Sequence, residues 1–114
     1  MKVKQIIDLI KGTVVSGTEN LEYTVEMAFA SDLMSDVLTV KTDNLLLLTG
    51  LVNIQAIRTA EMSDINCVVF VRNKKVTEEM IRIAKENRIT IIQSPYSMFK
   101  VSGILFNAGI KPVF

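Results

Sequence analysis

The sequence predicts an α/β fold, a three-layer α/β/α sandwich built on a mainly parallel sheet. Short apolar runs alternate with segments of helical periodicity along nearly the whole chain. Two of these runs, Leu45–Leu48 and Cys67–Val71, are continuously apolar, which is typical of strands buried on both faces of a parallel sheet. The 114 residues contain no low-complexity linker, so we expect one domain over residues 1–114.

The first part of the chain predicts a small helix, a short strand and a longer strand. Residues 3–10 place four apolar side chains on one helical stripe, and Gly12 is expected to end this helix. A β-prone piece over 13–16 follows. A second strand over 24–29 enters the core, and Ser31 is expected to be the N-cap of the next helix. On that helix the polar residues share the face opposite the apolar one: Asp32, Ser35, Asp36 and Thr39.

Two further strand–helix units follow. The strand 45–48 leads to a helix over 54–63 that Asn53 can cap. The strand 67–71 leads to a helix for which Thr77 is the candidate cap.

The last unit begins with a strand over 89–92. Ser94-Pro95 then favours the start of a helix that runs to about Ala108 and is capped by Gly109. Because strands and helices alternate, we expect right-handed crossovers with helices on both faces of the sheet.

A ligand site is expected at the carboxyl ends of the strands, where ligands bind in open parallel sheets. Four loops, 30–36, 49–53, 72–76 and 94–97, would meet there, and the helix N-termini among them favour anions. Lys74 and Ser97 lie on these loops. The candidate ligand-binding residues are Ser31, Asp32, Ser35, Asp36, Thr49, Gly50, Asn53, Arg72 and Ser94.

These residues also have purely structural interpretations. Ser31, Asn53 and Ser94 are explained as helix caps, and the cations of 72–75 as a solvated turn. Asp32 and Asp36 at helical spacing can form a solvated face, or hold Mg²⁺ through water. The sequence indicates no catalytic constellation and no particular cofactor, and neither the Walker nor the dinucleotide glycine motif occurs.

Residue usage narrows the function classes. The chain has no histidine and one cysteine, Cys67, which excludes a Cys/His zinc site and a histidine-dependent triad. The lone cysteine suits a reducing, cytoplasmic setting, and we expect it to be buried and inert. The net charge is +1 without a basic block, so we expect neither nucleic acid nor a membrane surface as a partner. We expect no signal peptide, because the first residues lack its apolar core and cleavage site, and no apolar run approaches the ~20 residues of a spanning helix.

The last predicted helix, residues 96–108, is apolar almost all round. Ser102 and Gly103 in its middle would allow close approach of another backbone. A helix that is apolar on all sides is buried on all sides, which in so small a domain predicts a homodimer. The alternative is an ordinary core helix with a short apolar tail over 110–114.

Four segments together resemble a known family, the DRTGG domain. They are ASDLMSDVL (30–38), LLLLTGLVNIQAIRTAEM (45–62), FVR (70–72) and SPYSMFKVSG (94–103). The resemblance covers nearly the whole chain and implies a three-layer α/β/α domain. The implied domain is similar to the N-terminal domain of HPr kinase/phosphorylase and to the middle region of some long phosphotransacetylases. It also occurs beside CBS domains in certain inorganic pyrophosphatases. The residues that match the shared pattern are Ser31, Asp32, Asp36, Thr49, Gly50, Asn53, Gln55, Arg58, Arg72 and Ser94.

The resemblance implies a regulatory or dimerising module without an established reaction. Many relatives carry an acidic–basic pair where this chain has Leu51 and Val52, so ligand contacts of that pair do not carry over. The chain has no Walker loop, so phosphocarrier kinase activity does not carry over either.

The sequence therefore favours a non-catalytic regulatory or ligand-sensing domain. It would bind a small anionic metabolite or nucleotide at the strand ends and act as a homodimer. One alternative is an interaction subunit that docks on a partner enzyme through the last helix or the Arg58 surface. The other is a small Mg²⁺-dependent enzyme that uses Asp32 or Asp36.

Overall fold

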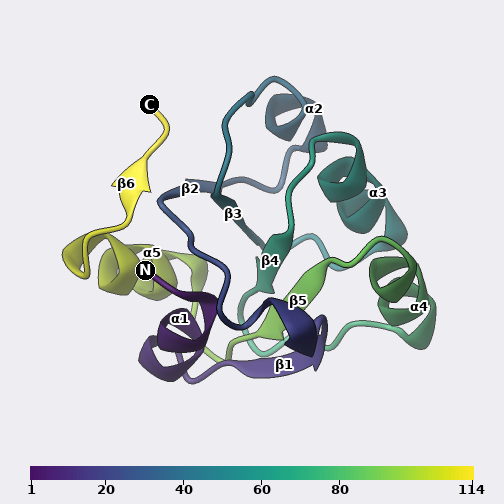
Figure 1. Ribbon diagram of the computed structural model, residues 1–114, viewed down its shortest axis with the longest axis horizontal. Coiled ribbons are helices and arrows are strands. Elements are labelled where there is room, and N and C mark those ends of the chain that lie inside the picture. The colour runs from purple at the N-terminus through teal and green to yellow at the C-terminus, as the bar shows by residue number, and fades with distance from the viewer.

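A computed structural model describes all residues 1–114 and shows one six-stranded sheet with helices on both faces (Figure 1). The strand order is β1-β5-β4-β3-β2-β6. The elements in chain order are α1 (Val3–Leu9), β1 (Thr13–Ser16), the 3₁₀ turn η1 (Thr18–Asn20), β2 (Met27–Ala30), α2 (Met34–Val37), β3 (Leu45–Thr49), α3 (Ile54–Met62), β4 (Cys67–Phe70), α4 (Glu78–Glu86), β5 (Thr90–Gln93), α5 (Met98–Asn107) and β6 (Lys111–Pro112).

The sheet is mainly parallel, as predicted. Strands β2 to β5 lie side by side in chain order and run parallel, and β6 pairs parallel with β2 at one edge. At the other edge β1 pairs antiparallel with β5. β6 lies within residues 110–114, for which the sequence predicted only a short apolar tail.

The path of the chain places the helices. The crossovers through α2, α3 and α4 step in one direction along the sheet, so these helices cover one face. The crossover from β5 to β6 runs the opposite way, so α5 lies on the other face, where it packs beside α1 (Figure 1). The predicted three layers are therefore present.

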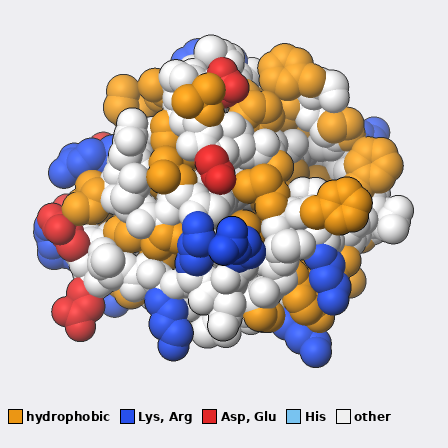
Figure 2. All heavy atoms as spheres, turned by 180° about the vertical axis from the view of Figure 1, so that it is seen from behind, with side chains coloured by type: hydrophobic (Ala, Val, Ile, Leu, Met, Phe, Trp, Pro, Cys, Tyr) orange, Lys and Arg blue, Asp and Glu red, His pale blue; other side chains and the backbone are white.

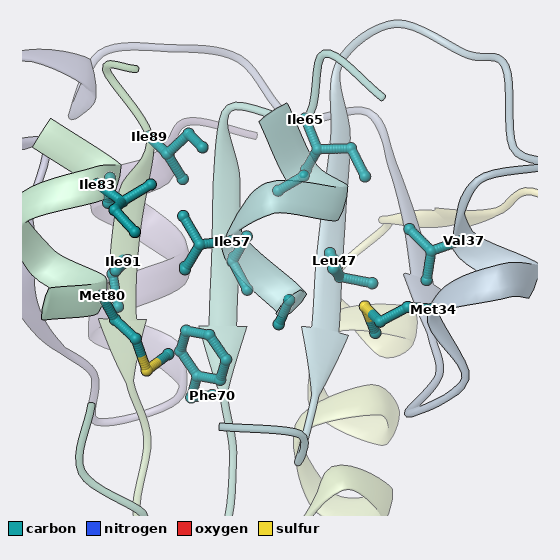
Figure 3. Close-up of a cluster of buried hydrophobic side chains, with 14 of the residues drawn as sticks. Met34, Val37, Leu47, Ile57, Ile65, Phe70, Met80, Ile83, Ile89 and Ile91 are labelled. Atoms are coloured by element: carbon teal, nitrogen blue, oxygen red, sulfur yellow. The ribbon is translucent and has the colours of Figure 1, made fainter. Parts of the chain in front are cut away.

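Each face of the sheet carries its own apolar core. β3 is buried along its whole length because its side chains alternate between the two cores: Leu45 and Leu47 face α2 to α4, whereas Leu46 and Leu48 face α1 and α5. Figure 3 shows the first core, in which Leu47, Phe70 and Ile91 of neighbouring strands point toward side chains of the covering helices. The continuous apolar runs of the sequence reflect this double burial.

Two of the four predicted N-caps are confirmed and two are wrong. The side chains of Asn53 and Thr77 accept hydrogen bonds from the backbone N–H groups of Ala56 and Met80, at the starts of α3 and α4. Ser31 is not a cap, because α2 begins only at Met34, with Leu33 at the cap position.

The final helix also begins later than predicted. Ser97 is its N-cap and accepts a hydrogen bond from the N–H of Lys100, so Ser94-Pro95 lies outside the helix. The second strand is shifted as well: it starts at Met27, because Thr24 instead pairs with Lys2. The isolated bridge between Thr24 and Lys2 thus explains why β2 begins later than strand propensity alone predicted.

Four helices end in the same way, with one residue in the left-handed region. These residues are Lys11, Asp64, Arg88 and Gly109, after α1, α3, α4 and α5. In each case the next N–H donates to a carbonyl near the end of the helix, for example Ile89 to Ala84 at 2.9 Å. Gly12, which we expected to end the first helix, directly follows the left-handed residue Lys11 and is not itself in that region. A Cβ on Gly12 would lie 2.6 Å from the Ile92 Cγ2, so its small size serves packing.

The last helix is buried on one side only. Val101 and Leu105 face the sheet, whereas Phe99 is 90% exposed and Phe106 is 66% exposed. The expectation that this helix is buried on all sides is therefore wrong for the single chain. Figure 2, which views the molecule from behind, shows hydrophobic groups gathered on the side that carries α5 and β6. None of the helices combines the length and the hydrophobicity that crossing a membrane requires.

Candidate functional site

The four predicted loops do meet at the carboxyl ends of the strands. Asp32, in the loop after β2, bonds to Thr49 and Gly50 at the end of β3. Lys74, in the loop after β4, reaches back to Gly50. The loop after β4 is tied in turn to the loop after β5, because the N–H of Arg72 donates to the Tyr96 carbonyl at 2.7 Å. One chain of hydrogen bonds therefore joins loops that lie far apart in the sequence.

Asp32 is the centre of this arrangement. Its Oδ1 accepts a hydrogen bond from the Thr49 hydroxyl at 3.0 Å and one from the Gly50 N–H at 2.6 Å. The Thr49 hydroxyl also accepts from the N–H of Leu51 at 3.1 Å. Thr49 is buried whereas Asp32 is exposed, and the second oxygen of the carboxylate, Oδ2, accepts no hydrogen bond within the chain.

Gly50 lies between a carboxylate and an ammonium group. The Lys74 Nζ donates to the Gly50 carbonyl at 2.7 Å. A Cβ on Gly50 would lie 3.5 Å from the Asp32 carboxylate oxygens and 3.6 Å from the Lys74 Nζ, which is ordinary contact distance. The absence of a side chain therefore leaves a small space that both charged groups border. We call Asp32, Thr49, Gly50 and Lys74 the Asp32–Lys74 cluster.

The loop that presents Lys74 has an unusual backbone. Arg72 and Asn73 are both in the left-handed region, at φ 65° and φ 58°. Residues with a Cβ are disfavoured there, and the pair is held by hydrogen bonds from their N–H groups to the carbonyls of Tyr96 and Ser94. Strained backbone of this kind persists where the surrounding structure fixes it, often close to a functional site.

Several predicted residues lie outside this cluster. Asp32 precedes α2, whereas Ser35 and Asp36 lie on it, so the interpretation of Asp32 and Asp36 as a pair on one helical face is wrong. Ser35 and Asp36 are exposed, and their side chains make no hydrogen bond within the chain. The Ser31 hydroxyl accepts from the N–H of Leu33 at 3.0 Å, and thereby shapes the turn that carries Asp32.

Three other candidates have separate places. Ser94 is 1% exposed, and its hydroxyl donates to the Ile10 carbonyl at 2.7 Å, so its side chain does not reach the cluster. Asn53 caps α3. Arg72 extends from the same loop as Lys74 and is exposed, without an ion pair in the structure.

Lys74 is the one residue of the Asp32–Lys74 cluster that was not among the predicted ligand-binding residues. Its loop was identified, but the three cations after β4 looked like a solvated turn. The available signal was strand order: consecutive parallel strands lie side by side, so a long side chain after β4 can reach the end of β3.

The surface hollows lie elsewhere. One of about 300 Å³ is lined mostly by apolar residues of β2, α5 and the C-terminal segment, including Ala30 and Leu48, which directly precede the loops of the cluster. No group of three or more His, Cys, Asp or Glu side chains is placed to hold a metal ion. Cys67 is buried, and this burial raises the pKa of its thiol to about 12.

The arrangement can be compared with known proteins. The family model of the DRTGG domain matches residues 5–108, which include every residue of the Asp32–Lys74 cluster. The chain belongs to the DRTGG-domain family. This agrees with the resemblance noted in the sequence. A comparison with curated proteins found no significant match.

One solved structure shares the fold of this DRTGG domain over almost its full length. It contains the CBS and DRTGG domains of the regulatory region of Clostridium perfringens pyrophosphatase, complexed with the activator diadenosine tetraphosphate. The TM-score is 0.78 at 16% identity, over 98% of this chain and 48% of that chain. The chain thus spans about half the length of its structural neighbour, and the likeness concerns the fold.

Proposed function

We propose that this DRTGG domain is a non-catalytic regulatory domain that senses a small anionic metabolite, with a nucleotide as the best-fitting class. The observation that carries the proposal is the Gly50 backbone between the Asp32 carboxylate and the Lys74 ammonium. The structural neighbour supports the same class, since it is a regulatory region whose activator is a dinucleotide.

The chemistry of the cluster suits a ligand with both hydroxyl groups and negative charge. The second Asp32 oxygen, which accepts no hydrogen bond within the chain, is an acceptor for sugar hydroxyls. Lys74 and the exposed Arg72 on the same loop would pair with phosphate oxygens. A nucleotide offers both kinds of group on one molecule.

The same geometry supports a binding role over catalysis. The Asp32 carboxylate already fixes the backbone of Gly50, and a general base must instead be free to take a proton from a substrate. The sequence left open a Mg²⁺-dependent enzyme that uses Asp32 or Asp36. Asp32 precedes α2 whereas Asp36 lies on it, so the two carboxylates do not form the pair on one helical face that was considered as a Mg²⁺ site.

A thermal-shift experiment tests the proposal. We expect ATP or diadenosine tetraphosphate at about 1 mM to raise the melting temperature of the wild-type protein, since a ligand that binds only the folded state stabilises it. Lys74→Met should abolish the shift. Lys41→Met is the matched control, because Lys41 is also exposed but lies in the loop before β3, at the opposite end of that strand.

Gly50→Ala makes the test sharper. The added methyl group meets its neighbours at 3.5 Å or more, so the variant should fold and melt like the wild type. The methyl group nevertheless fills the space between Asp32 and Lys74, so it should weaken the nucleotide-dependent shift. A wild-type protein that neither nucleotide stabilises, or a Gly50→Ala shift equal to that of wild type, would contradict a nucleotide site here.

We propose further that the domain acts as a homodimer. The exposed phenylalanines of α5 support this, because a contiguous apolar surface on a small domain commonly marks an interface. Sedimentation equilibrium should give twice the chain mass of 12.7 kDa at micromolar concentration. A mass of one chain would refute the dimer without bearing on nucleotide binding.

A further inference from the structure

One flank of α5 carries a symmetric apolar stripe. Phe99 and Phe106 are seven residues apart, which places them on the same side of the helix at a separation of about 10 Å. Ser102 and Gly103 lie between them on this flank. A Cβ on Gly103 would meet nothing within 4 Å, so the middle of the stripe is low and open.

The hollow of about 300 Å³ lies directly beside this stripe. Ser102 and Phe106 line it on α5, and Phe114 of the C-terminal segment is also among its lining residues. Its floor includes Ala28 and Ala30 of β2, whose short side chains leave the space unfilled. The helix therefore has a projecting phenylalanine near its start and an apolar depression near its end.

We propose that α5 pairs antiparallel with α5 of a second copy, about a two-fold axis that passes between Ser102 and Gly103. Phe99 of each copy then enters the hollow of the other copy, beside Phe106. This inference rests on the proposed homodimer and specifies the surface that forms it.

Self-complementarity argues for a second copy as the occupant. In a two-fold interface the same patch serves both partners, so the patch must carry both the projection and the recess. The stripe meets this requirement, because Phe99 and Phe106 lie at equal spacing on either side of its low centre. The missing side chain at Gly103 would let the two helices approach closely where they cross.

The available area is sufficient. Phe99, Phe106 and Phe114 are 90%, 66% and 87% exposed. At roughly 200 Å² for one phenylalanine, they expose close to 500 Å² per copy, or on the order of 1,000 Å² for a pair, the lower limit for a specific interface. The stripe contains no charged residue. The ammonium group of the neighbouring Lys100 lies over the Tyr96 ring, with its Nζ 3.8 Å from the ring centre.

A charge-swap experiment tests the antiparallel arrangement. F99K and F106E each place a charge in the apolar contact, so each variant alone should sediment as a monomer. In the proposed pair Phe99 of one copy faces Phe106 of the other. An equimolar mixture of the two variants should therefore form a heterodimer, in which the introduced lysine faces the introduced glutamate and the remaining phenylalanines still meet.

Gly103→Gln distinguishes an effect on dimerisation from an effect on the stability of the monomer. Gly103 lies inside a helix next to open space, so glutamine should raise the melting temperature of the monomer by a few degrees. The same side chain blocks the crossing of the helices and should weaken dimerisation at least tenfold. Met62→Asp is the matched control: Met62 is 70% exposed on α3, across the sheet from α5, and its replacement should leave the dimer intact.

The outcomes distinguish the two levels of the proposal. A wild-type dimer that survives F99K and Gly103→Gln would overturn the α5 pairing and leave the homodimer standing. A mixture of F99K and F106E that stays monomeric would overturn the antiparallel register. A wild-type monomer would overturn both, and the stripe would then be assigned to a partner protein.

Discussion

The backbone N–H of Gly50 donates a 2.6 Å hydrogen bond to the carboxylate of Asp32, so the loop after β2 fixes the end of β3. Asp32→Ala removes this bond and the one from Thr49, and should cost about 1 kcal/mol, a value reduced from that of buried charged bonds because Asp32 is exposed. Asp32→Asn keeps an acceptor and should cost less. Urea unfolding measures both.

Asp36→Ala is the control for this prediction. Asp36 is exposed on α2, and its side chain makes no hydrogen bond within the chain, so the change should stay within about 0.5 kcal/mol of wild type. Equal losses for Asp32→Ala and Asp36→Ala would show that the bonds to Thr49 and Gly50 do not stabilise the fold.

Thr49→Val tests the buried member of the cluster. The Thr49 hydroxyl donates to Asp32 and accepts from the N–H of Leu51, and valine has nearly the same shape without the hydroxyl. We expect a loss of about 1–2 kcal/mol, since the Leu51 N–H is left without its partner. The double variant with Asp32→Ala should lose less stability than the sum of the two single losses, because both changes break the same hydrogen bond. Strict additivity in the double-mutant cycle would contradict this.

The sequence predicted the layers and the meeting of the four loops because both follow from chain-local signals. The continuous apolar runs around Leu47 and Val69 require cover on both faces of a sheet. Parallel strands in chain order then bring their carboxyl ends together, which is how Asp32 comes to bond to Gly50.

The missed features depend on contacts that no local pattern encodes. Ser31 is a good cap by residue type, but the cap position is Leu33, two residues later, because the Asp32 side chain is held at β3. Lys74 belongs to the cluster because its long side chain reaches from the end of β4 to the end of the neighbouring strand β3. α5 was expected to be buried all round, yet its outer flank is free in the single chain, since periodicity says which residues are apolar and not what covers them.

Arg88→Gly should stabilise the protein. Arg88 follows α4 in the left-handed region at φ 56°, where a Cβ is strained, and its side chain makes no hydrogen bond or ion pair. Glycine relieves the strain but adds freedom to the unfolded chain, for a net gain of about 0.5–1 kcal/mol. Lys85→Gly, three residues earlier and inside the helix, should instead cost about 1 kcal/mol. Denaturant midpoints that move in the same direction for both variants would contradict the assignment of strain.

Glu22 should make stability depend on pH below about 4.5. Its carboxylate accepts hydrogen bonds from Lys2 at 2.7 Å and Lys4 at 2.8 Å, and these bonds lower its pKa from 4.5 to about 2. Because the folded pKa is lowered, the stabilisation is present above 4.5 and is lost as the pH falls toward 2. Glu22→Gln should therefore flatten the loss of stability in this window. The carboxyl carbon shift of Glu22 checks the midpoint directly, and a titration near 4.5 would show that the pairs do not persist in solution.

Cys67 should be protected from thiol reagents in the folded protein. It opens β4 between Leu46 and Thr90, is fully buried, and the pKa of its thiol is raised to about 12 by this burial. At pH 8 a soluble disulfide reagent can reach the thiol only when the sheet opens, so labelling should be on the order of a thousandfold slower than for a small free thiol. Guanidinium above the unfolding midpoint should restore fast labelling, which serves as the control. Complete modification of the folded protein within minutes would mean that β4 opens far more readily than its position in the middle of the sheet suggests.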